Sequence, residues 1–360
     1  MTGNCIGGAG EYPSQIDFEG YSSAGEGTYT AVGGSTPGEP GGLILFDGIS
    51  ATADNATFII NGGMGAGLSG ATLLFTATTS AANANITANG GVDDSKGGLF
   101  SFQKTSTGGT CSITLNGNAT LDLTKHTAGV TIGSLRGTGS AHLGENTLTI
   151  GSNNQSTAFS GVIQGTGGVT KSGSGTLTLS GNNTYTGPTA VKAGVLVTNN
   201  KQGSATGSGS VNVNAGTLGG QGAISGPVII GTGGGSGAFL APSAAAKQPV
   251  TLSLTSTLTF NSDATYTCTL QASKKKSAND EVVANGVTIA SGAQFNLVAK
   301  AQGKLKAGTS FTVISNTAST PISGTFANLA DGAILTVGKS KLQASYEGGD
   351  GNDLTLTVVP

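Results

Sequence analysis

Residues 167–200 read GGVTKSGSGTLTLSGNNTYTGPTAVKAGVLVTNN and contain the pattern that decides the fold. Within 176-TLTL-179, apolar side chains occupy every second position and Thr lies between them. Because successive side chains of a strand point to opposite faces, Leu177 and Leu179 are predicted to share a buried face. Thr suits the outer face, since its branched Cβ fits a pleated strand and its hydroxyl faces water. The stretch therefore predicts short strands separated by Gly- and Asn-rich turns.

The same alternation recurs along the chain, while long Gly-free stretches with helical apolar spacing are missing from the sequence. Alternating segments occur at 43–46, 57–60, 72–75, 120–124, 147–150, 211–214, 251–255, 257–260 and 354–358. The sequence is thus predicted to be all-β, with connections too short for crossover helices. Gly-Asn corners and loose repetition favour a solenoid of roughly 22 residues and about 4.8 Å per coil. Stacked Asn, Thr and aliphatic ladders are expected to hold the core and the corners.

The composition agrees with a thin, repetitive core. The 360 residues include 63 Gly, 12 Phe, 6 Tyr and no Trp, and the net charge is −2. One layer of aliphatic side chains per coil needs little bulk, whereas a compact core of this size needs more large side chains. The 16 Lys and Arg are scattered apart from Lys274–Lys276, which we interpret as a solvated loop. Without a basic stripe, nucleic acid is not expected as a partner.

The cysteines and the first residues of the chain indicate which disulfides, metal sites and export signals the sequence can contain. Cys5, Cys111 and Cys268 are odd in number and widely spaced, which excludes a disulfide framework and a zinc knuckle. Cys111 and Cys268 alternate with apolar residues, so we interpret both as small apolar members of a strand face. No stretch is apolar enough to span a bilayer as a helix, and residues 1–17 lack the features of a signal peptide. If the protein is secreted, this chain is expected to be a trimmed piece of a longer one.

Residues 167–200 also carry a family resemblance. Lys171, Gly175–Gly181, Asn183–Gly187 and Ala193–Leu196 fill, in order, the places of the autotransporter-associated β-strand repeat, which this stretch resembles. Residues 128–143 and 159–171 resemble the stretch that commonly precedes the repeat, and residues 285–360 resemble its common C-terminal unit. The resemblance covers about residues 110–360.

The resemblance implies an elongated, right-handed parallel β-helix exported to the bacterial surface as a stalk, an adhesive segment or a displayed passenger. We expect an irregular N-terminal β segment at 1–110 that forms the first coils, a β-helix at 111–284 and a C-terminal β-helix unit at 285–360. Members of the family usually end in an outer-membrane barrel or a sorting tail. Neither follows 358-VVP-360, so the mode of anchoring stays open and the expected location is extracellular or cell-surface.

The sequence contains few candidate catalytic or metal-binding residues. His126 and His142 lie near Gly-rich corners without an acid at a diagnostic spacing, so we interpret them as surface or turn residues. Acidic residues come close in sequence at 93–94, 280–281 and 350–353, each in a Gly, Ser or Asn turn where acids are solvated. The segment 348-GGDGNDLTL-356 nearly matches a Ca²⁺-binding nonapeptide, which makes Asp350 and Asp353 the candidate metal ligands. Its single copy, and Thr355 in the hydrophobic position, favour a tight turn without metal.

These observations predict a structural or adhesive segment with no catalytic residue and no cofactor site. The expected partners are a glycan or cell-surface ligand, or a second copy through end-to-end or lateral association. One alternative is a self-assembling extracellular filament, since an open solenoid end presents unpaired backbone groups. Another is a β-helical polysaccharide lyase or hydrolase, since fold alone does not decide function.

Overall fold

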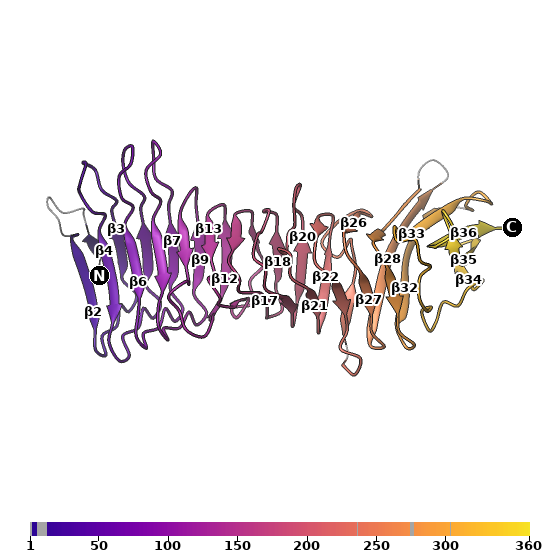
Figure 1. The fold of residues 1–360 in the computed structure, drawn as a ribbon, viewed down its shortest axis with the longest axis horizontal. Coiled ribbons are helices and arrows are strands. Elements are labelled where there is room, and N and C mark those ends of the chain that lie inside the picture. The colour runs from indigo at the N-terminus through magenta and orange to yellow at the C-terminus, as the bar shows by residue number, and fades with distance from the viewer. Residues whose placement is uncertain (1, 6–12, 236, 274–276, 303) are drawn as a thin grey trace. The chain divides into compact units, whose positions relative to one another are not determined.

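The computed structural model describes residues 2–5, 13–235, 237–273, 277–302 and 304–360. These residues form strands, turns and loops (Figure 1), and no helix that could cross a bilayer occurs among them. The chain divides into two compact units, residues 1–177 with 181–187 and residues 178–180 with 188–360. Strand β18 (Thr176–Leu179) is shared between the two.

The first unit is a parallel β-solenoid, in which strands pair with their counterparts one coil away. Its first sheet has the order β1 (Thr2–Cys5), β3 (Thr28–Ala31), β5 (Thr57–Ile60), β7 (Asn85–Ala88), β9 (Ser112–Leu115), β12 (Ser134–Gly137) and β15 (Thr157–Phe159). The second has β2 (Gln15–Glu19), β4 (Leu43–Asp47), β6 (Thr72–Phe75), β8 (Leu99–Phe102), β10 (Thr120–Asp122), β13 (Ser140–His142) and β16 (Val162–Gln164). The third has β11 (Val130–Ile132), β14 (Leu148–Ile150) and β17 (Val169–Lys171). The predicted all-β parallel solenoid is confirmed.

Coil length changes along this unit. Ser140 pairs with Val162 one coil on, a step of 22 residues that matches the sequence expectation. Thr28 pairs with Thr57, a step of 29 residues. The earlier coils are longer because they carry protruding Gly-rich loops, at 33–42, 62–70 and 90–98. Within the N-terminal segment that was expected to be irregular, β2 and β3 already pair in register with the next coil.

The core of the first coils is a column of aromatic rings. Phe18, Phe46, Phe75 and Phe102 are register partners in β2, β4, β6 and β8. The ring centroids of Phe46 and Phe75 lie 4.4 Å apart with planes 9° from parallel, and Phe18 and Phe46 stack in the same way. Phe46, Phe75 and Phe102 are fully buried, so the alternation seen in sequence becomes a continuous stack inside the solenoid.

The corners of the coils are held by side-chain ladders and by close backbone contact. The side-chain amide of Asn89 donates to Oδ1 of Asn61 at 2.9 Å, and that of Asn116 donates to Oδ1 of Asn89 at the same distance. The predicted Asn ladder is therefore present. At another corner, a Cβ on Gly161 would lie 1.8 Å from the Gly139 carbonyl oxygen, so only glycine allows the coils to stack there.

The second unit is built on the same plan, and its strands fall into three groups by their pairing. The first contains β20 (Val195–Thr198), β22 (Gly216–Gly220), β25 (Ala238–Leu240) and β28 (Ala264–Ser273), with β29 (Ser277–Asn279) and β32 (Gln294–Gln302) both pairing with β28. The second contains β19 (Thr189–Val191), β21 (Val211–Val213), β24 (Val228–Ile230), β27 (Leu258–Phe260) and β31 (Val287–Ile289). The third contains β23 (Ala223–Ile224), β26 (Thr251–Leu254), β30 (Glu281–Ala284), β33 (Ser310–Asn316), β36 (Asp353–Val359), β35 (Ser340–Gly348) and β34 (Ile334–Val337).

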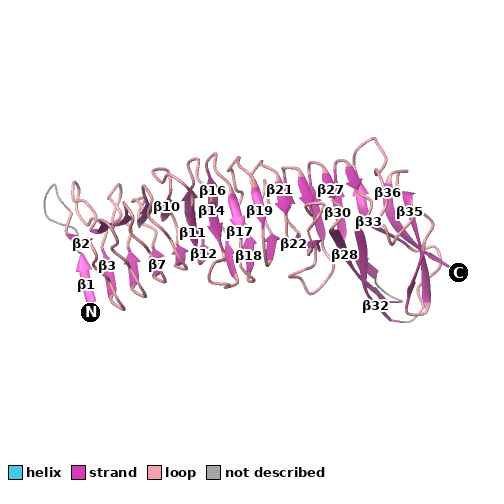
Figure 2. Cartoon of the chain, turned by 90° about the horizontal axis from the view of Figure 1, so that it is seen from below, coloured by secondary structure: helices cyan, strands magenta, loops and turns pink. Residues whose placement is uncertain are grey.

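The last strands depart from parallel pairing. β33 pairs with β30 in parallel but with β36 antiparallel, and β34, β35 and β36 form an antiparallel meander, seen in part in Figure 2. Phe326 and Leu329, which precede the meander, are buried, and the Tyr346 hydroxyl donates to the Leu329 carbonyl at 2.8 Å. This part of residues 285–360 therefore covers the core with antiparallel strands rather than with further parallel coils.

The aromatic column gives a direct test of the core. Phe75→Ala removes the ring between Phe46 and Phe102 and leaves a cavity, so we expect a loss of about 3–5 kcal/mol in the free energy of unfolding. Urea unfolding followed by circular dichroism measures this loss. Met64 is 60% exposed, and Met64→Ala is the matched control, with a change within about 0.5 kcal/mol. Equal unfolding curves for the two variants would contradict the column's role.

Candidate functional site

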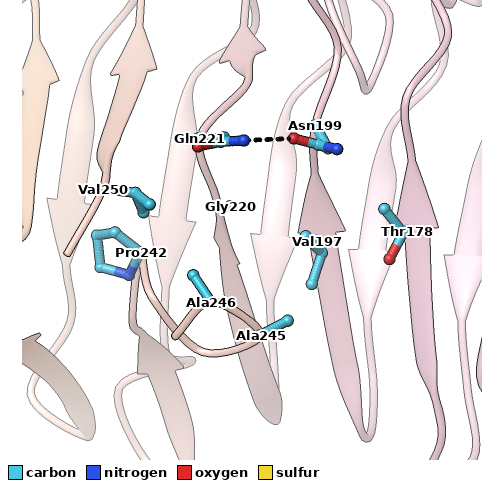
Figure 3. A pocket seen from close by; sticks show the side chains of 9 residues that line it. All are labelled: Thr178, Val197, Asn199, Gly220, Gln221, Pro242, Ala245, Ala246 and Val250. Atoms are coloured by element: carbon cyan, nitrogen blue, oxygen red, sulfur yellow. Dashed lines mark hydrogen bonds between the residues drawn. The ribbon is translucent and has the colours of Figure 1, made fainter. Parts of the chain in front are cut away.

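The second unit has a surface groove of about 340 Å³ (Figure 3). Its floor is the outer face of β20 and β22, and its wall is the loop between β25 and β26. Its lining consists of Thr178, Val197, Asn199, Gly220, Gln221, Pro242, Ala245, Ala246 and Val250. The loop is an insertion within one coil, so the solenoid serves as a rigid base for it.

The loop is fixed by a buried carboxylate. Asp280 is fully buried and accepts hydrogen bonds from the Ser243 hydroxyl at 2.7 Å and from the Val250 and Thr269 backbone N–H groups, both at 2.9 Å. Hydrogen bonds to a charged acceptor are stronger than neutral ones, and together they compensate for the burial of the carboxylate. The interpretation of Asp280 as a solvated turn residue was wrong, because its partners lie 11 to 37 residues away in sequence.

The lining of the groove suits ligand binding better than catalysis. Its described lining combines five apolar residues with two amides, and the Gln221 amide donates to Asn199 at 3.0 Å. The lining contains no titratable side chain. General acid–base and nucleophilic mechanisms both need an ionisable or activated group within reach of the substrate. The arrangement therefore suits a ligand held by apolar contact and amide hydrogen bonds.

The candidate metal ligands Asp350 and Asp353 lie at the turn between β35 and β36. Asp350 is exposed, whereas Asp353 is buried and accepts a hydrogen bond from the Asn316 backbone N–H at 2.8 Å. Burial, added to the nearby charge of Asp350, raises the pKa of Asp353 despite that hydrogen bond. Asp353 thus joins the turn to β33, and the described residues contain no cluster of three or more potential ligands. The preference for a tight turn without metal over calcium binding stays a prediction.

The two histidines differ in setting. His126 is buried, its Nε2 lies 2.8 Å from the Ser106 carbonyl oxygen, and its Nδ1 accepts from the Ala128 N–H at 3.2 Å. Of the expected surface or turn placement, the turn is correct and the surface is wrong, because both ring nitrogens bind backbone of the corner. His142 lies on β13, in register with Asp122 of β10. Sequence spacing could not reveal that neighbour, which lies one coil away, and no hydrogen bond joins the two described side chains.

The remaining charged candidates differ in how exposed they are. Asp93 and Asp94 are exposed with φ values of 50° and 60°, as predicted for a solvated turn. Glu281 follows the buried Asp280 but is only partly buried, so the two carboxylates do not form a joint site. Lys274–Lys276 lie outside the described residues.

Two cysteines are inert core residues. Cys111 and Cys268 are buried and unpaired, which confirms their interpretation as apolar members of a strand face. Burial raises the pKa of Cys111 to about 12 and that of Cys268 further, so neither thiol forms the reactive thiolate at neutral pH. The side chain of Cys5 is outside the described residues.

Lys171 has a structural role that the sequence did not reveal. Its side chain is 1% exposed, and its Nζ donates to the carbonyl oxygens of Ser172 at 2.5 Å and Gly173 at 2.8 Å. Burial lowers the pKa of the amine to about 8. The ammonium thus binds the carbonyls of the turn that follows β17.

Comparison with known proteins gives matches to a family model and to curated relatives. Residues 169–197 match the family model described as the passenger-associated-transport-repeat. A 98-residue segment is 43% identical to the adhesin BmaC autotransporter of Brucella suis biovar 1 (strain 1330), covering 27% of this chain and 3% of that protein. A 70-residue segment is 49% identical to an extracellular serine protease of Serratia marcescens, covering 19% of this chain and 6% of that protein. The chain therefore spans only a small part of each of these curated relatives.

Lys171 makes stability depend on pH. Between pH 8 and the ordinary lysine value of 10.5, the unfolded chain holds a proton that the folded chain has released. Rising pH therefore favours the folded state across that window. We expect the unfolding free energy of the parent chain to rise relative to Lys171→Met as pH increases from 8 to 10.5, measured by urea unfolding. Lys192→Met, at an exposed position, should show no such trend against the parent. A pH-independent difference for Lys171→Met would refute the assignment.

Proposed function

Because residues 169–197 form an autotransporter passenger repeat within a parallel β-solenoid, we propose that the chain is a secreted passenger segment. It acts at or beyond the bacterial surface as a stalk or adhesive segment, through its shape and outer faces and without catalysis. The observation that carries this proposal is the repeat itself: its alternation is used for coil stacking, as in β18, where Leu177 and Leu179 are buried.

The physical properties of the coils support a structural role. Within each unit, parallel backbone ladders join successive coils, and core and corner columns such as the Phe and Asn stacks of the first unit add to them. Neighbour-to-neighbour pairing of this kind gives a solenoid its stability without a large globular core. Outward positions are mostly Thr, Ser and Asn, which stay hydrated without a strong net charge.

An adhesive role would use the groove beside the loop of residues 241–250. Its apolar wall and the Asn199 and Gln221 amides suit a glycan or another neutral cell-surface ligand. The adhesin among the relatives supports this extension. The relative named as a protease does not support the polysaccharide lyase or hydrolase alternative, and its match covers 6% of that protein.

Surface display tests the proposal. A fusion protein carries the chain between a signal peptide and an outer-membrane translocator barrel. The amount of the chain that resists added protease on intact cells is then measured. We expect the parent chain to appear there. Leu177→Asp with Leu179→Asp should abolish the resistant species, because each change buries an unpaired carboxylate on the inner face of β18.

Thr178→Asp is the matched control, since it places the same charge on the outer face of the same strand. It should reach the surface in folded form. Retention of the parent chain inside the cell, or equal display of the inner-face and outer-face variants, would count against a passenger role.

Self-association into filaments is a second candidate, favoured by the distribution of charge. Residues 1–95 contain nine of the eighteen acidic side chains and none of the Lys or Arg. Acidic Asp17 and Glu19 lie exposed on β2, which pairs with β4 alone among the described strands. An acidic edge on one copy and the basic remainder of another attract each other, and the unpaired edge can add a strand.

This candidate predicts salt-dependent assembly. In about 0.01 M salt, where the Debye length is about 30 Å, sedimentation velocity should show species that grow with concentration. In about 1 M salt they should return to a single species, because the Debye length falls to about 3 Å. Asp17→Asn with Glu19→Gln should weaken the assembly at low salt. A single species at every concentration and ionic strength would exclude it.

A further inference from the structure

A second groove, of about 480 Å³, lies between two strand edges in the C-terminal part of the second unit. One side is β32, which pairs with β28 and with no other described strand. The other side is β34, which pairs only with β35 among the described strands. The lining consists of Leu297 and Ala299 of β32 and of Leu335, Thr336, Val337 and Gly338 at β34. Both edges thus present main-chain groups toward one hollow.

The free stretch of β32 is bounded at both ends. The Asn328 side chain accepts from the Phe295 N–H and donates to the Phe295 carbonyl, both at 2.8 Å, as a neighbouring strand would. Beyond β32, the Leu305 N–H donates to the Ser340 hydroxyl at 2.8 Å. Because alternate residues of a strand point their main-chain groups to the same side, Leu297 and Ala299 direct theirs toward the groove, as Phe295 does toward Asn328.

A lysine follows the lining residues on each side of the groove, and we call this pair the lysine rim. Lys300 directly follows Ala299, and Lys339 directly follows Gly338, and both are exposed. Across residues 294–342 the acidic side chain is Asp331 alone. The lysines of this stretch, all exposed, are Lys300, Lys304, Lys306, Lys339 and Lys341. A ligand for this groove is therefore expected to be anionic.

Apolar side chains also lie exposed on these two strands. Val298 is 40% exposed and Ile334 is 49% exposed, values that are high for large aliphatic residues. An extended peptide covers such residues with its alternate side chains while its main chain pairs with the strand edge. A glycan could meet the lysines but could not complete two β-ladders.

We propose that the groove between β32 and β34 binds an extended acidic peptide segment of a partner protein, which adds as a strand between the two edges. Its main chain hydrogen-bonds Leu297 and Ala299 on one side and β34 on the other. Its carboxylates face the lysine rim. The lining spans positions 297–299 of β32 and 335–338 at β34, so the paired part of the peptide is about three or four residues long. This inference does not depend on the passenger function.

The test uses the full chain and three short synthetic peptides, measured by fluorescence anisotropy in low salt. The first alternates Val and Glu, the second alternates Val and Lys, and the third is the acidic peptide with central prolines, which cannot complete a ladder. We expect the first to bind and the other two to bind at least about tenfold more weakly. The work is done at protein concentrations where sedimentation shows a single species.

Variants locate the binding site. Lys300→Glu with Lys339→Glu should weaken the acidic peptide by about tenfold or more, whereas Lys192→Glu with Lys201→Glu, both exposed elsewhere in the second unit, should leave it unchanged. Ala299→Pro removes an N–H that faces the groove and spares the pairing with β28, so it should abolish binding while circular dichroism stays that of the parent. If this variant does not fold, the lysine pair still decides the result.

Several outcomes would overturn the proposal. Equal binding of the acidic and proline-containing peptides would show that strand addition is not involved. If both double lysine variants lost the same affinity for the acidic peptide, binding would be due to general charge attraction. Heparin binding that depends on Lys300 and Lys339, without binding of the acidic peptide, would assign the rim to anionic polysaccharide instead.

Discussion

The parallel register between successive coils is the constraint on which the rest of the structure depends. A position in one coil lies directly above the same position in the next, so its side chain packs against the side chain at that equivalent position. Phe46 and Phe75 stack for this reason, and Asn61 and Asn89 exchange an amide hydrogen bond for the same reason. A sequence that keeps this register therefore becomes repetitive, with aliphatic, aromatic, Asn and Gly columns rather than a varied core.

The same constraint separates positions that can vary from positions that cannot. Gly161 has no room for a Cβ, because the backbone of the neighbouring coil lies too close. Between such corners the chain can leave the ladder and return, as it does in the longer coils before residue 110 and in the loop of residues 241–250. That loop is fixed by Asp280, whose carboxylate binds both of its ends through Ser243 and Val250. Insertions of this kind add a binding surface without disturbing the register.

Alternation in the sequence was enough to predict the strands, the inner face of β18 and the burial of Cys111, because these follow from neighbours two residues apart. It was not enough for Asp280 or His126, whose partners come from other coils. Lys171 was recognised as part of the repeat, but its burial against the next turn depends on backbone geometry that spacing does not show. The antiparallel β34–β36 was missed for a related reason, since parallel and antiparallel strands have the same period of two.

A solenoid satisfies nearly all of its main-chain groups within its own ladders, and this limits where it can recognise another molecule. The flat faces offer side chains alone, mostly Thr, Ser and Asn, which bind weakly and with little selectivity. Main-chain recognition becomes available only where a ladder stops, and β32 and β34 both stop beside the same groove. The change from parallel coils to an antiparallel meander, which covers the core, thus also leaves two strand edges facing each other. Stability and recognition have the same structural origin in this part of the chain.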